Sequence, residues 1–233
     1  MKERPITFSA EMVRAILKGR KSQTRRVIAF PRSTGAFVCV QGFWKDRPDE
    51  WQPLVSIDGE STDDGKGCET PILCPYGVPG DRLWVKETFY SWRCKIYSSS
   101  GITEEPEECV YRANGGTLVN GAQWKSSRFM RREYSRITLE ITNVRVERLQ
   151  DISEEDAKAE GVVPYSMTQQ DIDDLQISDS SPDEKLLARL MGPGSFSHKF
   201  TFQMLWDELN EKRGYGWNVN PWVWRIAFKR VAE

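Results

Sequence analysis

The chain has 233 residues, with 33 Lys and Arg against 34 Asp and Glu, one His and a formal net charge of -1; its mean hydropathy of -0.58 is typical of a globular protein in water. No run approaches the roughly 20 apolar residues of a membrane-spanning helix, and the first residues lack the apolar core of a signal peptide, so we expect a cytoplasmic protein without a membrane partner. Near-neutral charge argues against a protein that coats DNA non-specifically through a surplus of Lys and Arg.

Charge is distributed unevenly along the chain. Residues 1–32 carry nine Lys and Arg against two Glu, whereas residues 151–185 carry eleven Asp and Glu against two Lys. A basic first region and an acidic later insertion are therefore both expected.

Five cysteines, an odd number with no C-x-x-C pair, favour reduced thiols over disulfide bonds. Four of them lie between residues 68 and 109, but the single histidine, His198, is remote in sequence. A zinc site is therefore weakly supported beside the simpler interpretation of buried or idle thiols, and we predict no metal or other cofactor.

The first elements form a strand, a helix and a second strand. Arg4–Phe8 is extended in character, and Ser9 stands at the N-cap position of a helix. The apolar residues of that helix recur at helical spacing and are Met12, Val13, Ile16 and Leu17. Gly19 is expected to end the helix, and Lys21–Ile28 to form the second strand.

The middle of the chain is predicted to be rich in loops and strands. Residues 33–70 are rich in Gly, Asp, Ser and Pro and predict loop with some strand, whereas the turn residues of 75–81 lead into a strand over Arg82–Glu87. Arg136–Leu149 alternates like a strand but changes phase at Thr142, which predicts a bulge or bend.

The last third is predicted to be mainly helical until a closing strand. Ser153 begins a short helix that Gly161 ends. Residues 163–196 read as an acidic excursion with a small helix around Glu184–Leu190. A further helix is predicted to lie on the core through apolar residues at i, i+3, i+4 and i+7, namely Phe202, Leu205, Trp206 and Leu209. The closing strand alternates through Trp222–Phe228.

These elements favour a mixed α+β domain or a small barrel over a doubly wound α/β fold. The chain has no G-x-G-x-x-G motif, no P-loop, no G-x-S-x-G elbow and no internal repeat, so nucleotide-binding folds and common hydrolase folds have no motif support.

The densest polar run is Gly19–Arg26, at the junction between the first helix and the second strand. Arg and Lys at such a junction can bind phosphate, and a hydroxyl beside an ammonium group can act as a nucleophile when the Lys loses its proton easily. A solvated basic turn is the alternative interpretation of the same residues.

The segment Ile16–Arg25 resembles the G-R-K-[TS]-x-T-x-R signature of ASCH domains, which belong to the PUA-like superfamily. Three further blocks are similar in order and together with it cover about a third of the chain: Pro79–Val85, Leu149–Gly161 and Trp222–Phe228. The chain is also similar to ASCH-like proteins of bacteriophages and prophages at Trp124, Ser127, Met130, Arg132 and Gly214–Trp224. It departs from their pattern at Phe129 and Arg131, where His and Pro are more usual.

The resemblance implies a single domain over residues 1–233, a PUA-like small mixed β-barrel with flanking short helices. Insertions would then lie near 33–70, 91–123 and 162–196. It also implies a cleft that accepts RNA or a modified nucleobase.

One bacterial branch of the family hydrolyses N4-acetylcytidine to cytidine and acetate with a Lys, a Thr and a Glu, and without a metal. By resemblance these catalytic residues are Lys21, Thr24 and Glu160. Thr24 would attack the amide carbonyl, Lys21 would take its proton, and Glu160 would position water or protonate the leaving amine. From the residues alone, Glu160 reads as an ordinary acid on a helix surface.

A non-catalytic RNA- or DNA-binding regulatory protein of phage or prophage origin is the alternative function. Basic side chains would bind phosphate and aromatic side chains would stack on bases. The predicted binding residues are Arg20, Arg25, Arg26, Arg132 and Trp124, with Arg128, Arg131, Arg136, Phe129 and Tyr134 as further candidates. An accessory protein that acts through protein contacts, with acidic residues 165–185 as its surface, also stays open.

Overall fold

The computed structural model describes two compact units, one formed by Met1–Glu147 with Trp222–Glu233 and the other by Arg148–Pro221. The described residues are 1–29, 37–39, 43–44, 47–51, 54–56, 69–71, 73–92, 95–98, 101–104, 108–116, 118, 122–164, 166–167 and 194–231. The single domain with three insertions stays a prediction, because most of residues 33–70 and 162–196 lie outside these ranges.

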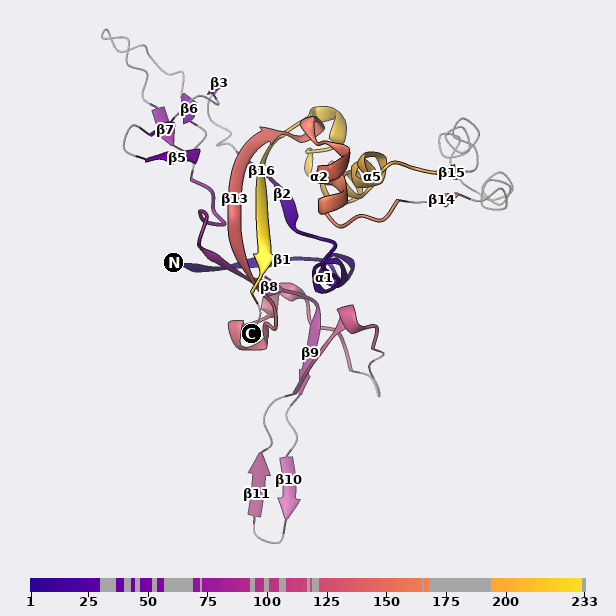
Figure 1. Ribbon diagram of the computed structural model, residues 1–233. Helices are drawn as coiled ribbons and strands as arrows, with labels where there is room; N and C mark the ends of the chain where they lie inside the picture. Colours follow the sequence, from indigo (N-terminus) through magenta and orange to yellow (C-terminus); the bar gives the residue numbers. More distant parts are fainter. Residues whose placement is uncertain are drawn as a thin grey trace. The chain divides into compact units, whose positions relative to one another are not determined.

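A five-stranded mixed sheet organises the first unit (Figure 1). Its strands, in spatial order, are β1 (Glu3–Thr7), β8 (Arg82–Lys86), β13 (Thr138–Arg148), β16 (Trp222–Arg230) and β2 (Gln23–Val27). β1 runs parallel to β8, whereas β13 is antiparallel to β8 and β16 to β2. The α+β class is therefore confirmed, and no closed barrel is present among the described residues.

The helix α1 (Ala10–Leu17) connects β1 to β2 and has the predicted ends. The Met12 N–H donates to Ser9 Oγ at 3.4 Å, which makes Ser9 the N-cap. Gly19 follows with a φ of +71°, a left-handed conformation that glycine adopts without strain. The strand–helix–strand prediction for this region is confirmed.

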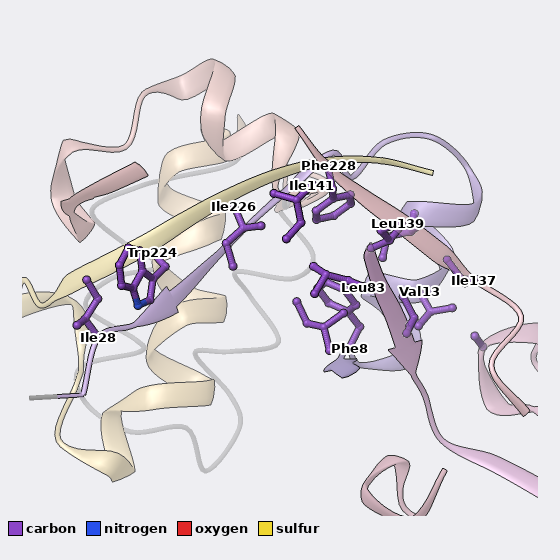
Figure 2. Close-up of a cluster of buried hydrophobic side chains, with 14 residues drawn as sticks. Phe8, Val13, Ile28, Leu83, Ile137, Leu139, Ile141, Trp224, Ile226 and Phe228 are labelled. Atoms are coloured by element: carbon purple, nitrogen blue, oxygen red, sulfur yellow. The ribbon is translucent and has the colours of Figure 1, made fainter. Parts of the chain in front are cut away.

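The core of the first unit fills the space between this helix and one face of the sheet. Figure 2 shows Trp224, Ile226 and Phe228 in a row along β16, with Leu83, Phe8 and Val13 below the end of that row. The buried apolar residues of this cluster are Ile6, Phe8, Val13, Ile16, Ile28, Leu83, Val85, Ala113, Ile137, Leu139, Ile141, Trp224, Ile226 and Phe228. Burying each large apolar side chain stabilises the fold by roughly 1.5–3 kcal/mol.

The predicted phase change in the long strand is present. β13 is one continuous strand, but Thr142 and Asn143 are both exposed, so the alternation of its inward residues shifts by one position there. Beyond the shift, Val144 and Val146 pack partly buried against the core. The ribbon of β13 curves strongly along its length (Figure 1).

Shorter elements complete the described part of the first unit. The antiparallel pairs and the small sheet are formed by β3 (Phe37–Cys39), β4 (Phe43–Trp44), β5 (Arg47–Trp51), β6 (Leu54–Ser56), β7 (Glu69–Pro71), β9 (Phe89–Trp92), β10 (Lys95–Ser98), β11 (Gly101–Glu104) and β12 (Glu108–Tyr111). Three 3-10 turns are η1 (Arg112–Asn114), η2 (Ser127–Phe129) and η3 (Arg132–Tyr134). Residues 33–70 therefore contain the expected short strands.

The second unit is mainly helical where it is described. Its elements are η4 (Leu149–Asp151), α2 (Glu154–Ala159), β14 (Ser166–Met167), β15 (Gly194–Ser195), α5 (His198–Asn210), η5 (Glu211–Arg213) and η6 (Trp217–Val219). Ser153 caps α2 as predicted, because its Oγ accepts from the Asp156 N–H. Gly161, with a φ of +87°, follows the helix end.

The apolar face of α5 is only partly buried. Phe202 and Trp206 are buried and pack near Trp217. Leu209 is 56% exposed, so its predicted place on a buried face is wrong. The 3-10 turn η5 follows α5 directly. Among the described residues of the unit, the Leu209 side chain in the last turn of α5 is therefore left largely in solvent. The predicted helix around Glu184–Leu190 lies outside the described residues.

None of the described helices is both long and apolar enough to cross a membrane.

Candidate functional site

The Gly19–Arg26 segment folds back on the end of α1 instead of extending into solvent. The N–H groups of Arg20 and Lys21 both donate to the Ala15 carbonyl, at 2.8 and 3.2 Å. Arg20 is exposed, but Lys21 is only 5% exposed and Thr24 only 4%. A solvated basic turn therefore describes Arg20 and not the two residues that the ASCH resemblance makes catalytic.

The register of β2 against β16 shows which way Thr24 and Arg26 face. Thr24 lies opposite Ile226, and Arg26 lies opposite Trp224. Paired residues of antiparallel strands project from the same face, and residues two apart on one strand share that face. Because Ile226 and Trp224 belong to the core, Thr24 and Arg26 both face the core side of the sheet.

Lys21 and Arg26 both lie beside the ring of Phe8, a residue of the core. The Lys21 Nζ lies 5.6 Å from the centroid of the Phe8 ring, and the Arg26 Cζ lies 5.2 Å from the same centroid. Phe8 itself is 5% exposed and packs near Phe228. We call Phe8, Lys21, Thr24 and Arg26 the Phe8 cluster.

Arg26 also holds the end of β1. Its Nη2 donates to the Thr7 carbonyl at 2.6 Å, and the Phe8 N–H donates to the Lys86 carbonyl at 3.1 Å. The aromatic ring of the cluster is therefore fixed by backbone and side-chain hydrogen bonds next to it. Two cations thus lie beside a fixed aromatic ring, and such cations can bind negative or carbonyl groups of a ligand.

Arg25 lies on the opposite face of β2 and is paired. Its Nε and Nη2 lie 2.8 and 2.6 Å from Glu147 Oε1, and its side chain is fully buried while that of Glu147 is 19% exposed. A phosphate at Arg25 would have to displace this carboxylate. The sequence placed Arg25 with Arg26 as binding residues, and the structure puts them on opposite faces.

Glu160 belongs to the second unit, where it follows α2. Its N–H donates to the carbonyls of Asp156 and Ala157, and the residue is 3% exposed. The interpretation of Glu160 as a surface acid is therefore wrong. A carboxyl group with so little solvent requires protein partners for its charge, whereas its assignment to the same reaction as Lys21 stays a prediction of the resemblance.

Arg132 is also engaged within the first unit. Its guanidinium donates to both carboxylate oxygens of Glu3, at 3.1 and 3.3 Å, and to Thr138 Oγ1 at 3.2 Å. The hydrogen bond from Arg132 lowers the pKa of the Glu3 carboxyl below its usual value. Trp124, the remaining predicted binding residue, is half-buried. Two of the five predicted binding residues, Arg25 and Arg132, are thus held in ion pairs within the first unit.

A buried ion pair that the sequence did not point to lies near η1. Arg136 Nε and Nη2 donate to the two carboxylate oxygens of Glu87 at 2.9 and 3.0 Å, and Glu87 is 1% exposed. The Arg136 guanidinium lies 3.9 Å from the centroid of the Tyr111 ring. Burial, followed by a hydrogen bond with the Cys109 thiol, raises the pKa of Tyr111, so its hydroxyl stays protonated and donates to the Tyr134 carbonyl.

The Glu87–Arg136 pair has no local signal, because the two residues are 49 positions apart. The two side chains meet because their strands are paired: the Val85 N–H donates to the Ile137 carbonyl, which brings the nearby Glu87 and Arg136 together. Asn114 accepts a hydrogen bond from Arg136 Nη1 at 2.9 Å. We therefore interpret the contacts of Arg136 with Glu87 and Asn114 as structural: they connect the end of β8 and the start of β13 to η1.

Among the residues that the structure describes, no group of three or more His, Cys, Asp or Glu is arranged to hold a metal ion. Cys74 and Cys109 are not joined in a disulfide bond, and burial raises the pKa of the Cys74 thiol. Cys68 and Cys94 lie outside the described residues, so the alternative of a zinc site is not decided by these two thiols.

Comparison of this chain with family models, curated proteins and solved structures finds no match. Membership of the ASCH family therefore stays a prediction carried by the motifs around Lys21 and Thr24. What the protein does has to be inferred from its own residues.

Proposed function

We propose that the chain is a PUA-like, barrel-type ASCH domain with insertions, and that the Phe8 cluster of its first unit recognises a nucleic acid or modified pyrimidine. In its enzymatic form, Lys21 and Thr24 catalyse metal-independent amide hydrolysis of a substrate like N4-acetylcytidine. The observation that carries the proposal is the burial of both residues, Lys21 beside the Phe8 ring that Arg26 also contacts, and Thr24 on the core face of β2 two positions before Arg26. Withdrawing polar side chains from water costs free energy, and residues that bear this cost are candidates for a functional site as well as for a structural ion pair such as Arg25–Glu147.

The arrangement of the first unit supports the fold in this proposal. A parallel β1–β8 pair lies within an otherwise antiparallel sheet, and α1 connects β1 to the strand that carries Thr24. The G-R-K-x-x-T residues thus occupy the helix-to-strand junction that the resemblance requires. The missing element is closure of the sheet into a barrel, which the described residues do not contain.

The chemistry follows from the two side chains. Thr24 Oγ1 forms a bond to the acetyl carbonyl carbon while the Lys21 amine accepts the hydroxyl proton. The C–N bond then breaks, its electron pair stays on the exocyclic nitrogen of cytidine, and that nitrogen takes the proton. Water hydrolyses the acetyl ester left on Thr24 and releases acetate. Lys can act as a base only when uncharged, a form that desolvation and neighbouring positive charge both favour.

Release of acetate from N4-acetylcytidine by the purified full chain tests this function. Lys21→Met and Thr24→Val should each lower turnover by at least about 100-fold, because each removes one partner of the base–nucleophile pair. Glu160→Gln tests the third residue of the resemblance in the same assay. Lys18→Gln, three residues before Lys21 and exposed, is the matched control for loss of a nearby cation.

Far- and near-UV circular dichroism of every variant would verify folding. A folded wild type that releases no acetate from N4-acetylcytidine or related N4-acylated cytosines would overturn the hydrolase. If that protein still bound RNA or DNA through Lys21 and Arg26, the non-catalytic alternative would replace it.

A further inference from the structure

One aromatic side chain of the first unit is displayed to solvent between two cations. Phe129 is 71% exposed at the end of η2, with exposed Arg128 before it and Arg131, whose side chain is 74% exposed, two residues after it. A solvent-exposed phenyl ring contributes no burial free energy to the fold, and a ligand that covered it would gain that free energy on binding. We call Lys125–Arg131 the Phe129 turn.

The Phe129 turn is fixed at its start. The Lys125 N–H donates to the Phe89 carbonyl at 2.7 Å, and the Phe89 N–H donates back to the Lys125 carbonyl at 3.2 Å. The Lys125 Nζ donates to Ser91 Oγ at 2.8 Å. The Arg128 N–H then donates to Ser126 Oγ at 3.4 Å, which caps η2.

The same turn is also fixed at its end. The Lys86 Nζ donates to the Arg128 carbonyl at 2.6 Å. Met130 is 2% exposed, and its Sδ accepts from the Glu87 N–H at 3.4 Å. The backbone on both sides of Phe129 is therefore anchored to the sheet, and the ring is held outward on a preorganised turn.

The charges around the ring select the ligand. The segment from 122 to 136 has five Lys and Arg and one acid, Glu133. Arg132 and Arg136 are committed to Glu3 and Glu87. Among the described residues Arg131 pairs with Glu133, both well exposed, and such surface pairs are weak enough for a phosphate to displace. The ligand must therefore combine flat apolar faces with negative charge.

We propose that the Phe129 turn binds single-stranded nucleic acid, with a base stacked on Phe129 and the flanking phosphates bound by Arg128 and Arg131. Every base has a π-face that can stack on an aromatic ring, and the phosphates supply the charge that the guanidinium groups require. In a duplex the bases are already stacked on each other, so the turn favours single strands.

The turn is connected to the Phe8 cluster through one residue. Lys86 accepts from the Phe8 N–H with its carbonyl and donates to the Arg128 carbonyl with its Nζ. A strand bound at Phe129 thus leads toward the proposed pyrimidine site. This part of the inference rests on the proposed function, and it makes the substrate a pyrimidine within a nucleic-acid chain.

Fluorescence anisotropy with a labelled, cytosine-rich single-stranded RNA of roughly 12 nucleotides, its DNA equivalent and the matching duplexes tests the turn. Phe129→Ala should weaken single-strand binding by about 5- to 100-fold, the effect of losing one stacked base. Phe129→Tyr should retain affinity, whereas Phe129→Leu should not, because Leu keeps apolar area without a ring. Arg128→Gln with Arg131→Gln should reduce the slope of log affinity against log salt by about 1.4.

Leu73→Ala, at an exposed apolar residue of the same unit, is the matched control and should not change affinity. Three results would overturn the proposal: equal affinity for duplex and single strand, wild-type affinity of Phe129→Leu, or wild-type affinity of Phe129→Ala. Phe129-dependent binding without acetate release would keep this site and reject the hydrolase. Acetate release without Phe129-dependent binding would support the hydrolase and reject the Phe129 site.

Discussion

The two faces of β2 carry side chains of similar polarity for different purposes. On the core side, Lys21 and Arg26 lie beside the Phe8 ring, and Thr24 shares the face of β2 that carries Arg26. On the other side, Arg25 is buried against Glu147. One basic motif is thus divided by strand alternation into a candidate site and a structural ion pair. Adjacent residues of a motif should therefore fail in different ways when they are changed.

The largest expected effect is on the structural face. Arg25→Leu leaves the Glu147 carboxylate without its buried partner and should lower the free energy of unfolding by about 3–5 kcal/mol. Urea unfolding followed by circular dichroism measures it. Because the double variant Arg25→Leu, Glu147→Leu removes both charges, it should recover much of the loss. If Arg25→Leu is as stable as wild type, the ion pair does not hold β2 to β13.

Thr24, which precedes Arg25 in the sequence and lies on the core face, should show the opposite pattern: a small change in stability and a large loss of turnover. Thr24→Val keeps the side-chain shape opposite Ile226 and should change the free energy of unfolding by no more than about 1 kcal/mol. Turnover should nevertheless be lost. Stability and acetate release measured on the same preparation make the comparison with Arg25→Leu direct. A large destabilisation with residual turnover would assign Thr24 to the fold instead.

Asp81 provides a reference carboxylate at the other end of the same sheet. Burial would raise its pKa, but the Lys2 N–H at 2.7 Å, Arg4 Nη1 at 2.9 Å and the Val78 N–H outweigh it and lower the pKa below 3.8. The ionised form is thus the stabilising one. Its contribution is complete above pH 5 and is lost as the pH falls through the folded-state pKa.

Asp81→Asn should therefore lower the free energy of unfolding by about 1.5–3 kcal/mol at neutral pH, because charged hydrogen bonds are replaced. The difference from wild type should shrink below pH 4. Unfolding free energies of both proteins between pH 7 and pH 2 check this. A difference that is independent of pH would mean that the carboxylate charge is not what holds residues 2–4.

The smallest effect is expected in the helical unit. Burial would raise the pKa of Glu154, but the N–H groups of Lys199 and His198 and the His198 ring outweigh it and lower the pKa. Glu154 is 45% exposed in its side chain, so solvent screening limits Glu154→Gln to under about 1 kcal/mol. Hydrogen exchange of the first turn of α5 should be faster in the variant near neutral pH, and the difference should disappear under acidic conditions.

Local signals in the sequence were sufficient for many boundaries of the fold. Ser9 and Gly19 delimit α1, and Ser153 and Gly161 delimit α2, because caps and left-handed glycines act within a few residues. The strands with alternating apolar residues were equally readable. The side of α5 that Leu209 occupies was not, since the apolar period is the same whether or not another element covers the last turn.

The chain's own sequence also pointed to Lys21 and Thr24, because the dense G-R-K-x-x-T run lies at a helix-to-strand junction. Alternation along the predicted strand separates Arg25 from Arg26, but only the tertiary structure showed that Arg25 is paired with Glu147 and that Lys21 and Thr24 are withdrawn from solvent. The partners of the paired cations lie 122 residues away for Arg25, 129 for Arg132 and 49 for Arg136. The order of strands in the sheet decides which residues form these pairs. The sequence alone therefore does not distinguish an Arg that is paired in the fold from an Arg that can bind a ligand.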